Sequence, residues 1–106
     1  MMYDSFHANI EEKNQALAID SCKDETIHVH VSENDRGVPG TGGVNWESFW
    51  SGIRTSGYDG YLTIEAFGRA LPALAAATRV WRDLFPDAIG LCHDGIAFIK
   101  KNTGKA

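Results

Sequence analysis

"HVHVSENDRGVPGTG" runs from His28 to Gly42 and joins an alternating apolar segment to a loop rich in glycine. The β-branched, alternating residues of Thr26–Val31 predict a strand. Alternation places Thr26, His28 and His30 on one face of that strand and leaves the opposite face apolar. The strand therefore has one polar face, and an ionisable residue lies near its C-terminal end.

A second segment, Gly60–Gly68 (GYLTIEAFG), repeats this pattern. Tyr61, Thr63 and Glu65 fall on one face, and the opposite face is apolar. Glu65 takes the place that His30 takes in the first strand. Two strands thus carry ionisable groups at equivalent ends.

Helical patterns separate and flank the two strands. Between the strands, an apolar spacing of i, i+3, i+4 and i+7 predicts one helix face, with Asn45 as N-cap and Gly57 as stop. That face contains Trp46, Phe49, Trp50 and Ile53. A shorter helix is expected over residues 14–23, with Asn14 as its cap.

Residues 71–85, which follow the second strand, are rich in helix formers, and Pro72 suits a first helical turn. Pro86 is expected to end this helix. Its buried stripe is predicted to contain Leu74, Thr78, Trp81 and Phe85. A last short helix is expected over residues 94–102, and the alternation of helices and strands predicts parallel strands.

The polar strand faces indicate a barrel. Strands of an open parallel sheet are usually apolar on both faces, whereas a β/α barrel carries reactive groups at the C-terminal ends of its strands. We therefore predict an α/β fold, a partial (β/α)8 TIM barrel. Residues 1–106 are expected to form a single incomplete barrel domain.

Composition excludes two classes of partner. The net charge is −4, and the only basic cluster lies at the tail (Lys100, Lys101 and Lys105), which disfavours a nucleic-acid partner. No apolar run approaches the roughly 20 residues of a membrane span. Cys22 and Cys92 match no metal or redox spacing, so we expect reduced thiols and a cytoplasmic location.

Asp4, His30 and Glu65 stand at the expected ends of three neighbouring parallel strands and can converge on one point. An imidazole with two carboxylates suits Mn²⁺, Co²⁺ or Mg²⁺ better than a thiolate-bound metal. On the pattern alone, two interpretations are about equally well supported: a metal site, or a buried histidine with satisfied hydrogen bonds and a solvent-facing glutamate. Arg36, in the glycine-rich loop, has a solvated interpretation of similar weight.

Four segments resemble a known family. "YDSFHANIEE", "HVHVSENDRGVPGTG", "GYDGYLTIEAFG" and "LAAATRVWR" are similar, in order and spacing, to the C-terminal part of ketose 3-epimerases. These enzymes form the tagatose/psicose 3-epimerase group of the xylose isomerase-like sugar epimerases and isomerases. The resemblance extends from Asp4 to about Arg82 and implies the last two to three β/α units of the barrel.

The resemblance implies a metal-dependent reaction on a ketose sugar. Asp4, His30 and Glu65 match the metal ligands, with Mn²⁺ the commonest metal, and His7 and Arg36 match residues that contact the substrate. Glu65 is then also a catalytic residue. One glutamate removes the proton at C3, a cis-enediolate forms, and a second glutamate returns a proton to the opposite face.

The second glutamate of the family pattern has no match here. We therefore expect a truncated gene, a fragment or one piece of an assembly, inactive in epimerisation by itself. Its partner would be another copy of the chain or a complementing barrel segment. Helix faces that carry Trp46, Trp50 and Trp81 are expected to lack their barrel neighbours.

Two other interpretations stay open. The chain could be a catalytically inactive, oligomeric structural module that keeps the fold pattern. Within the same barrel family, a hydroxypyruvate isomerase or an inosose dehydratase relative also fits these residues.

Overall fold

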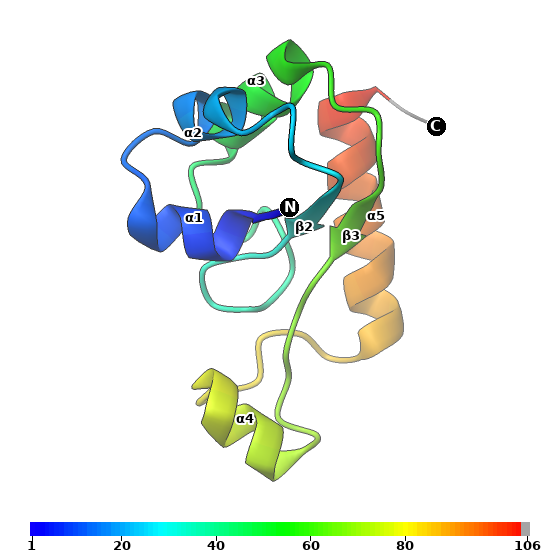
Figure 1. Ribbon diagram of the computed structural model, residues 1–106. Coiled ribbons are helices and arrows are strands. Elements are labelled where there is room, and N and C mark those ends of the chain that lie inside the picture. Colours follow the sequence, from blue (N-terminus) through cyan, green and yellow to red (C-terminus); the bar gives the residue numbers. More distant parts are fainter. Residues whose placement is uncertain (105–106) are drawn as a thin grey trace.

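Three short parallel strands form the sheet in the computed structural model, which describes residues 1–104 (Figure 1). The spatial order is β1-β2-β3, so each strand lies beside its neighbour in the chain. Lys105 of the predicted basic tail lies outside the described residues. The elements are β1 Met2–Asp4, α1 Ser5–Glu11, α2 Gln15–Ser21, β2 His28–Val31, α3 Trp46–Ser56, β3 Leu62–Ile64, α4 Pro72–Thr78 and α5 Ala88–Thr103.

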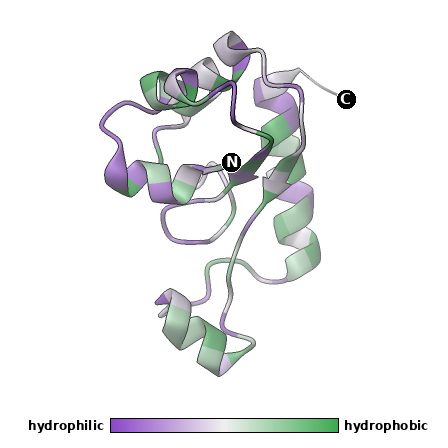
Figure 2. Ribbon diagram, in the orientation of Figure 1, coloured by the Kyte–Doolittle hydropathy of each residue, from purple (hydrophilic) through white to green (hydrophobic). Residues whose placement is uncertain are grey.

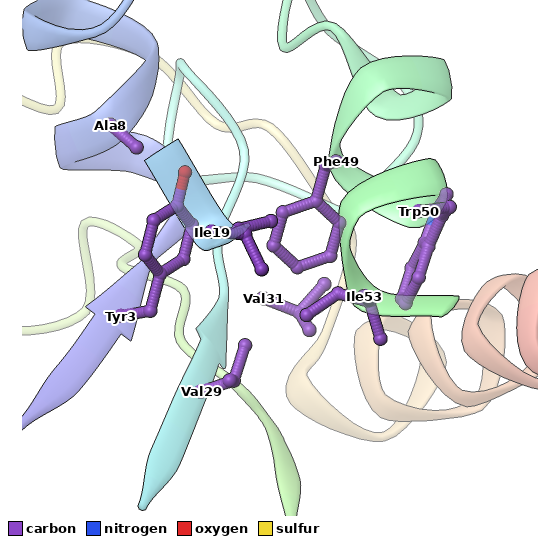
Figure 3. Packing of buried hydrophobic residues seen from close by; sticks show 8 residues of the cluster. All are labelled: Tyr3, Ala8, Ile19, Val29, Val31, Phe49, Trp50 and Ile53. Carbon is purple, nitrogen blue, oxygen red and sulfur yellow. The ribbon is translucent and has the colours of Figure 1, made fainter. Parts of the chain in front are cut away.

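The apolar face of β2 forms the centre of the core. Val29 and Val31 are completely buried, as the alternating pattern predicts. They face Phe49 and Ile53 of α3, and Tyr3 of β1 flanks them (Figure 3). The polar face of the same strand is thereby turned away from the helices.

Both helices with strong end signals form as predicted. The side chain of Asn14 accepts a hydrogen bond from the N–H of Leu17 at the start of α2. Asn45 caps α3 through the N–H of Ser48. Gly57 ends α3 in the left-handed conformation (φ 74°).

The first of the three strands expected from the position of Asp4 forms at the start of the chain. Met2–Asp4 is a strand paired in parallel with β2, and α1 follows it directly. Ser5 Oγ donates to the carbonyl of Ser32 (2.7 Å) and accepts from its N–H (2.8 Å). This reciprocal pair fixes the end of β1 against the end of β2.

The helix predicted over 71–85 is wrong in length. α4 ends at Thr78 because Arg79 takes a left-handed conformation (φ 59°), and the N–H of Val80 returns to the carbonyl of Ala75. Val80 consequently turns inward, and Trp81 is 70% exposed. The predicted stripe of Leu74, Thr78, Trp81 and Phe85 therefore does not form, and α4 projects away from the sheet (Figure 1).

An ion pair joins the two segments of the chain that precede and follow α4. The Arg69 guanidinium donates to both carboxylate oxygens of Asp83, at 3.0 and 3.2 Å. The hydrogen bond and charge of Arg69 hold the pKa of the Asp83 carboxyl below its ordinary value. Both side chains are exposed, so this pair adds little to stability.

The last helix is longer than the predicted 94–102. α5 starts at Ala88, where Asp87 accepts a hydrogen bond from the N–H of Gly90. Glycines at 90 and 95 weaken the helical signal in the sequence. Gly95 packs closely against β3: a Cβ there would lie 2.6 Å from Ile64 Cδ1, so the end of that side chain would have to move.

Two of the three tryptophans expected to lack neighbours are covered. Trp50 is 1% exposed, and the half-buried Trp46 packs edge-on against Phe49 and Phe98, with ring centroids 5.3 and 5.1 Å apart. The expectation was wrong because α5 folds back over α3. Of the three, Trp81 alone stays largely exposed.

The helices contain both apolar and polar residues (Figure 2). Several of the apolar side chains are exposed. Examples with more than 60% exposure are Ile10, Leu17, Ile27, Tyr61, Leu71, Trp81 and Ile89. Within residues 1–104, no helix is both long enough and apolar enough to cross a membrane.

Truncation of Phe49 to alanine should destabilise the chain by about 3–5 kcal/mol, because the ring is fully buried against the valines of β2. Leu17→Ala serves as the control, since Leu17 is 68% exposed and should cost less than about 0.5 kcal/mol. Urea unfolding followed by circular dichroism measures both. Equal losses would contradict this description of the core.

We expect the chain to self-associate in solution. β1 and β3 are both edge strands, and exposed edges beside apolar side chains favour association. Sedimentation velocity over a wide range of protein concentration tests this expectation. A monomer that unfolds cooperatively at every concentration would contradict it.

Candidate metal centre

The register of the sheet brings three ionisable residues to one edge. Asp4 pairs with His30 across β1 and β2, and His30 pairs with Thr63 across β2 and β3. Glu65 follows two residues after Thr63, on the same face. Its N–H donates to the carbonyl of Val31, so the alignment continues past the end of β3.

The carboxylate of Asp4 has two separate environments. Oδ1 caps α1 and accepts hydrogen bonds from the N–H groups of Phe6 (2.8 Å) and His7 (3.0 Å). Oδ2 is buried, makes no hydrogen bond with residues 1–104, and lies 3.4 Å from His30 Nδ1. A buried oxygen that accepts no hydrogen bond costs about 1–3 kcal/mol of folding stability. Oδ2 is therefore suited to bind a ligand that is not part of the protein chain.

His30 contacts both carboxylates through the same ring nitrogen. Nδ1 makes a short contact with Glu65 Oε2 and lies 3.4 Å from Asp4 Oδ2. Each of the three residues offers one ligand atom, and these atoms all lie within 4.8 Å of one another. Among residues 1–104 this is the one such group of three histidine, cysteine or acidic side chains.

The donor set fits a divalent cation. Two carboxylate oxygens and one imidazole nitrogen suit Mn²⁺ or Co²⁺, and Mg²⁺ accepts the oxygens more readily than the nitrogen. Asp4 Oδ2, which is buried and accepts no hydrogen bond within residues 1–104, is one of these oxygens. Three protein ligands leave coordination positions open for water or substrate.

Arg36 lies against Glu65 and is not solvated. Its Nη1 donates to Ser32 Oγ at 2.9 Å and to Glu65 Oε1 at 3.4 Å. Its guanidinium carbon stands 3.4 Å from the centre of the Phe6 ring and 5.2 Å from that of Phe67. With only 8% of the residue exposed, the solvated interpretation of Arg36 is wrong.

His7 stands apart from the three clustered residues. Its side chain is exposed and packs edge-on against Phe6, with ring centroids 5.0 Å apart. It shares with Asp4 the wall of an open hollow of about 290 Å³ beside β1 and α1. The predicted role of His7 in contacting a substrate stays a prediction.

Sequence reasoning missed Glu33, whose carboxylate accepts hydrogen bonds from the loop beside the site. The sequence patterns assign no role to Glu33, yet its side chain is fully buried. Four N–H groups of the loop and of α3 point at its carboxylate. An acidic residue directly before a glycine-rich segment, whose N–H groups need acceptors, is the signal that could have found it.

Comparison with known proteins identifies the family. The model of the xylose isomerase-like TIM barrel matches residues 1–94. The chain belongs to this family. The resemblance and the barrel class predicted from the sequence are thus confirmed, with three parallel strands and five helices of the barrel present in the described residues.

The similar proteins are sugar epimerases. A probable ketose 3-epimerase of Synechocystis sp. is 34% identical over 101 residues, which are 95% of this chain and 35% of that protein. An L-ribulose 3-epimerase of Methylomonas sp. is 35% identical and covers 92% of this chain. The crystal structure of a Methylomonas D-allulose 3-epimerase in complex with D-allulose superposes with a TM-score of 0.88, at 34% identity, over 96% of this chain and 36% of that one.

The chain therefore spans about a third of the length of the relatives it matches. These relatives place it in an enzyme family of the isomerase class. The part of the barrel that the chain contains includes the three strand ends at which Asp4, His30 and Glu65 cluster.

His30→Ala should weaken Mn²⁺ binding by more than about tenfold, because it removes one of three ligands. Isothermal calorimetry on the soluble chain measures the affinity. His93→Ala is the control, since His93 is an exposed histidine on α5 outside the cluster, and this variant should bind Mn²⁺ as the wild type does. Equal affinity of His30→Ala and wild type would rule out the assignment.

Proposed function

We propose that the chain forms the metal-binding and sugar-contacting part of a ketose 3-epimerase. One observation carries the proposal: Asp4, His30 and Glu65 converge at the C-terminal ends of three parallel strands, with Arg36 held against Glu65. Reactive groups of β/α barrels lie at this end of the strands. The names of the similar proteins support the substrate class, a ketose, and the position of epimerisation, C3.

In this proposal, Asp4 Oδ2, His30 Nδ1 and one oxygen of Glu65 would hold a divalent cation, most simply Mn²⁺. The chemistry that such a cation supplies is polarisation of the ketose carbonyl and a neighbouring hydroxyl, which acidifies the C–H bond at C3.

In the proposed reaction Glu65 is both a metal ligand and the group that moves the C3 proton. One carboxylate oxygen faces His30, and the other lies 3.4 Å from Arg36 Nη1. The carboxylate takes the C3 proton, or returns it, on the face of the sugar that it contacts. The adjacent guanidinium keeps this carboxylate oriented.

Arg36 is placed to bind oxygens that gain negative charge as the proton leaves. Its Nε is buried and has no hydrogen-bond partner within residues 1–104, so these residues leave part of the donor capacity of the guanidinium unused. The rings of Phe6 and Phe67 hold the guanidinium rigidly. A fixed donor of this kind stabilises developing charge without reorganisation. His7, at the rim of the hollow beside Asp4, would contact a more distant part of the sugar.

Inversion at C3 needs a second base on the opposite face of the sugar. Asp4 and Glu65 are the carboxylates of the cluster, and both project from the same edge of the sheet. We therefore propose that a partner supplies the second carboxylate: either another copy of the chain or a complementing barrel segment. By itself the chain would bind metal and ketose without inverting the sugar.

A cytoplasmic location fits this proposal and stays a prediction. Cys22, which is half-buried, and Cys92, which is exposed, are both free thiols. Free thiols are the usual state of cysteine in a reducing compartment.

Incubation of the Mn²⁺-loaded chain with D-fructose or D-tagatose in D₂O tests the function. We expect deuterium to enter at C3 with no inverted product, because Glu65 reaches one face only. NMR of the sugar follows both events. Glu65→Gln should abolish exchange, and Glu25→Gln, an exposed charge change away from the cluster, should retain it.

Two other results would change the assignment. Inverted product that Glu65→Gln abolishes would show that the second base is present in the chain or its oligomer. Metal binding with no exchange on any ketose would favour the inactive structural module over the enzyme.

A further inference from the structure

The carboxylate of Glu33 lies at the centre of the loop that joins β2 to α3, residues 32–45. The residue is completely buried, and no ion pair among residues 1–104 includes it. Its negative charge is balanced by N–H donors alone. These are the N–H groups of Asn34 (3.0 Å) and Val44 (3.0 Å) on Oε1, and the N–H of Gly40 (2.8 Å) and Nε1 of Trp46 (2.7 Å) on Oε2.

The loop and the carboxylate depend on each other. A buried charge is costly unless it is hydrogen-bonded, and four donors satisfy both of its oxygens. The loop is irregular, so its N–H groups lack the partners that a helix or sheet would supply. Glycine is needed where the chain wraps the acid: Gly40 has φ 94°, and a Cβ on Gly42 would lie 2.7 Å from Glu33 Cγ.

The same residue connects the loop to the candidate metal centre. The carbonyl of Glu33 accepts a hydrogen bond from the N–H of Arg36 (3.1 Å), in a turn that puts Arg36 at φ 66°. The carbonyl of Arg36 in turn accepts from the N–H of Phe67 (2.9 Å), two residues after Glu65. The guanidinium reaches Glu65 itself. A continuous path of contacts therefore leads from Glu33 to the end of β3.

We propose that Glu33 is a positioning residue of the site. Its buried carboxylate holds loop 32–45 in the conformation that places the Arg36 guanidinium against Glu65 and ties the Arg36 carbonyl to Phe67. The role of the positioned groups in sugar chemistry rests on the proposed function. The positioning itself does not, because it is a property of the chain without metal or sugar.

Hydrogen exchange at single amides tests the path. In Glu33→Gln, which keeps the side-chain volume, an amide donor replaces one acceptor oxygen and faces N–H groups. We expect the amides of Gly40, Val44 and Phe67 to exchange about tenfold faster or more, while Ala18 in α2 changes by less than about twofold. Residue-level mass spectrometry on the metal-free chain measures all four.

The exchange rate of the Phe67 amide distinguishes positioning of the site by Glu33 from a general effect of Glu33 on stability. The N–H of Phe67 is not among the four donors to the Glu33 carboxylate and donates instead to the carbonyl of Arg36. Faster exchange at Gly40 and Val44 with Phe67 unchanged would overturn the proposal, because the effect would end in the loop. Acceleration at Ala18 by the same factor would overturn it too, because Glu33 would then only stabilise the whole fold.

Two further variants complete the experiment. Trp46→Phe removes a single donor to Glu33 and should accelerate the same amides by a smaller factor, which keeps the test decisive if Glu33→Gln does not fold. Glu47→Gln is the matched control: this exposed glutamate makes the same charge change on α3 and should leave Gly40 and Phe67 unchanged. Since no sugar or metal is present, failure of the epimerase assay would leave this result unaffected.

Discussion

The parallel register of the three strands is the constraint on which the site depends. Asp4 lies directly opposite His30, and His30 opposite Thr63, so three strand ends share one edge and one face. A slip of a single residue between β1 and β2 would turn a whole strand face over. Val29 and Val31 prevent that slip, because their burial under α3 leaves only the polar face for His30. One face of β2 thus forms the core, and the opposite face carries His30 of the site.

Arg36 joins the connections that follow all three strands. Phe6 comes after β1, Arg36 after β2 and Phe67 after β3, and the guanidinium lies against both rings. Its Nη1 donates to Ser32 and approaches Glu65 in a mostly buried place. Arg36 therefore holds the segments that follow the three strands together around the carboxylates of the site.

The sequence predicted those parts of the fold whose signals are local. Asn14 and Asn45 are strong caps, and alternation identified the buried face of β2. The end of α4 could not be predicted, because Arg79 adopts a left-handed conformation that ordinary propensity disfavours, and only tertiary packing of Val80 accounts for it. Strand-end position and family resemblance together indicated Asp4, His30 and Glu65. Glu33 was missed because its burial depends on N–H groups up to thirteen residues away, including Trp46 Nε1.

Asp4 performs two tasks with one carboxylate, and this restricts which amino acids the position can accept. Asparagine would keep the cap on α1, but it would offer a neutral amide where an anionic oxygen faces His30. Glutamate would keep the charge, but its longer side chain is poorly suited to cap the N–H groups of Phe6 and His7. Helix initiation disfavours glutamate and ligand chemistry disfavours asparagine, so only the two tasks together select aspartate. If the ligand task were lost, asparagine would serve at this position as well as aspartate does.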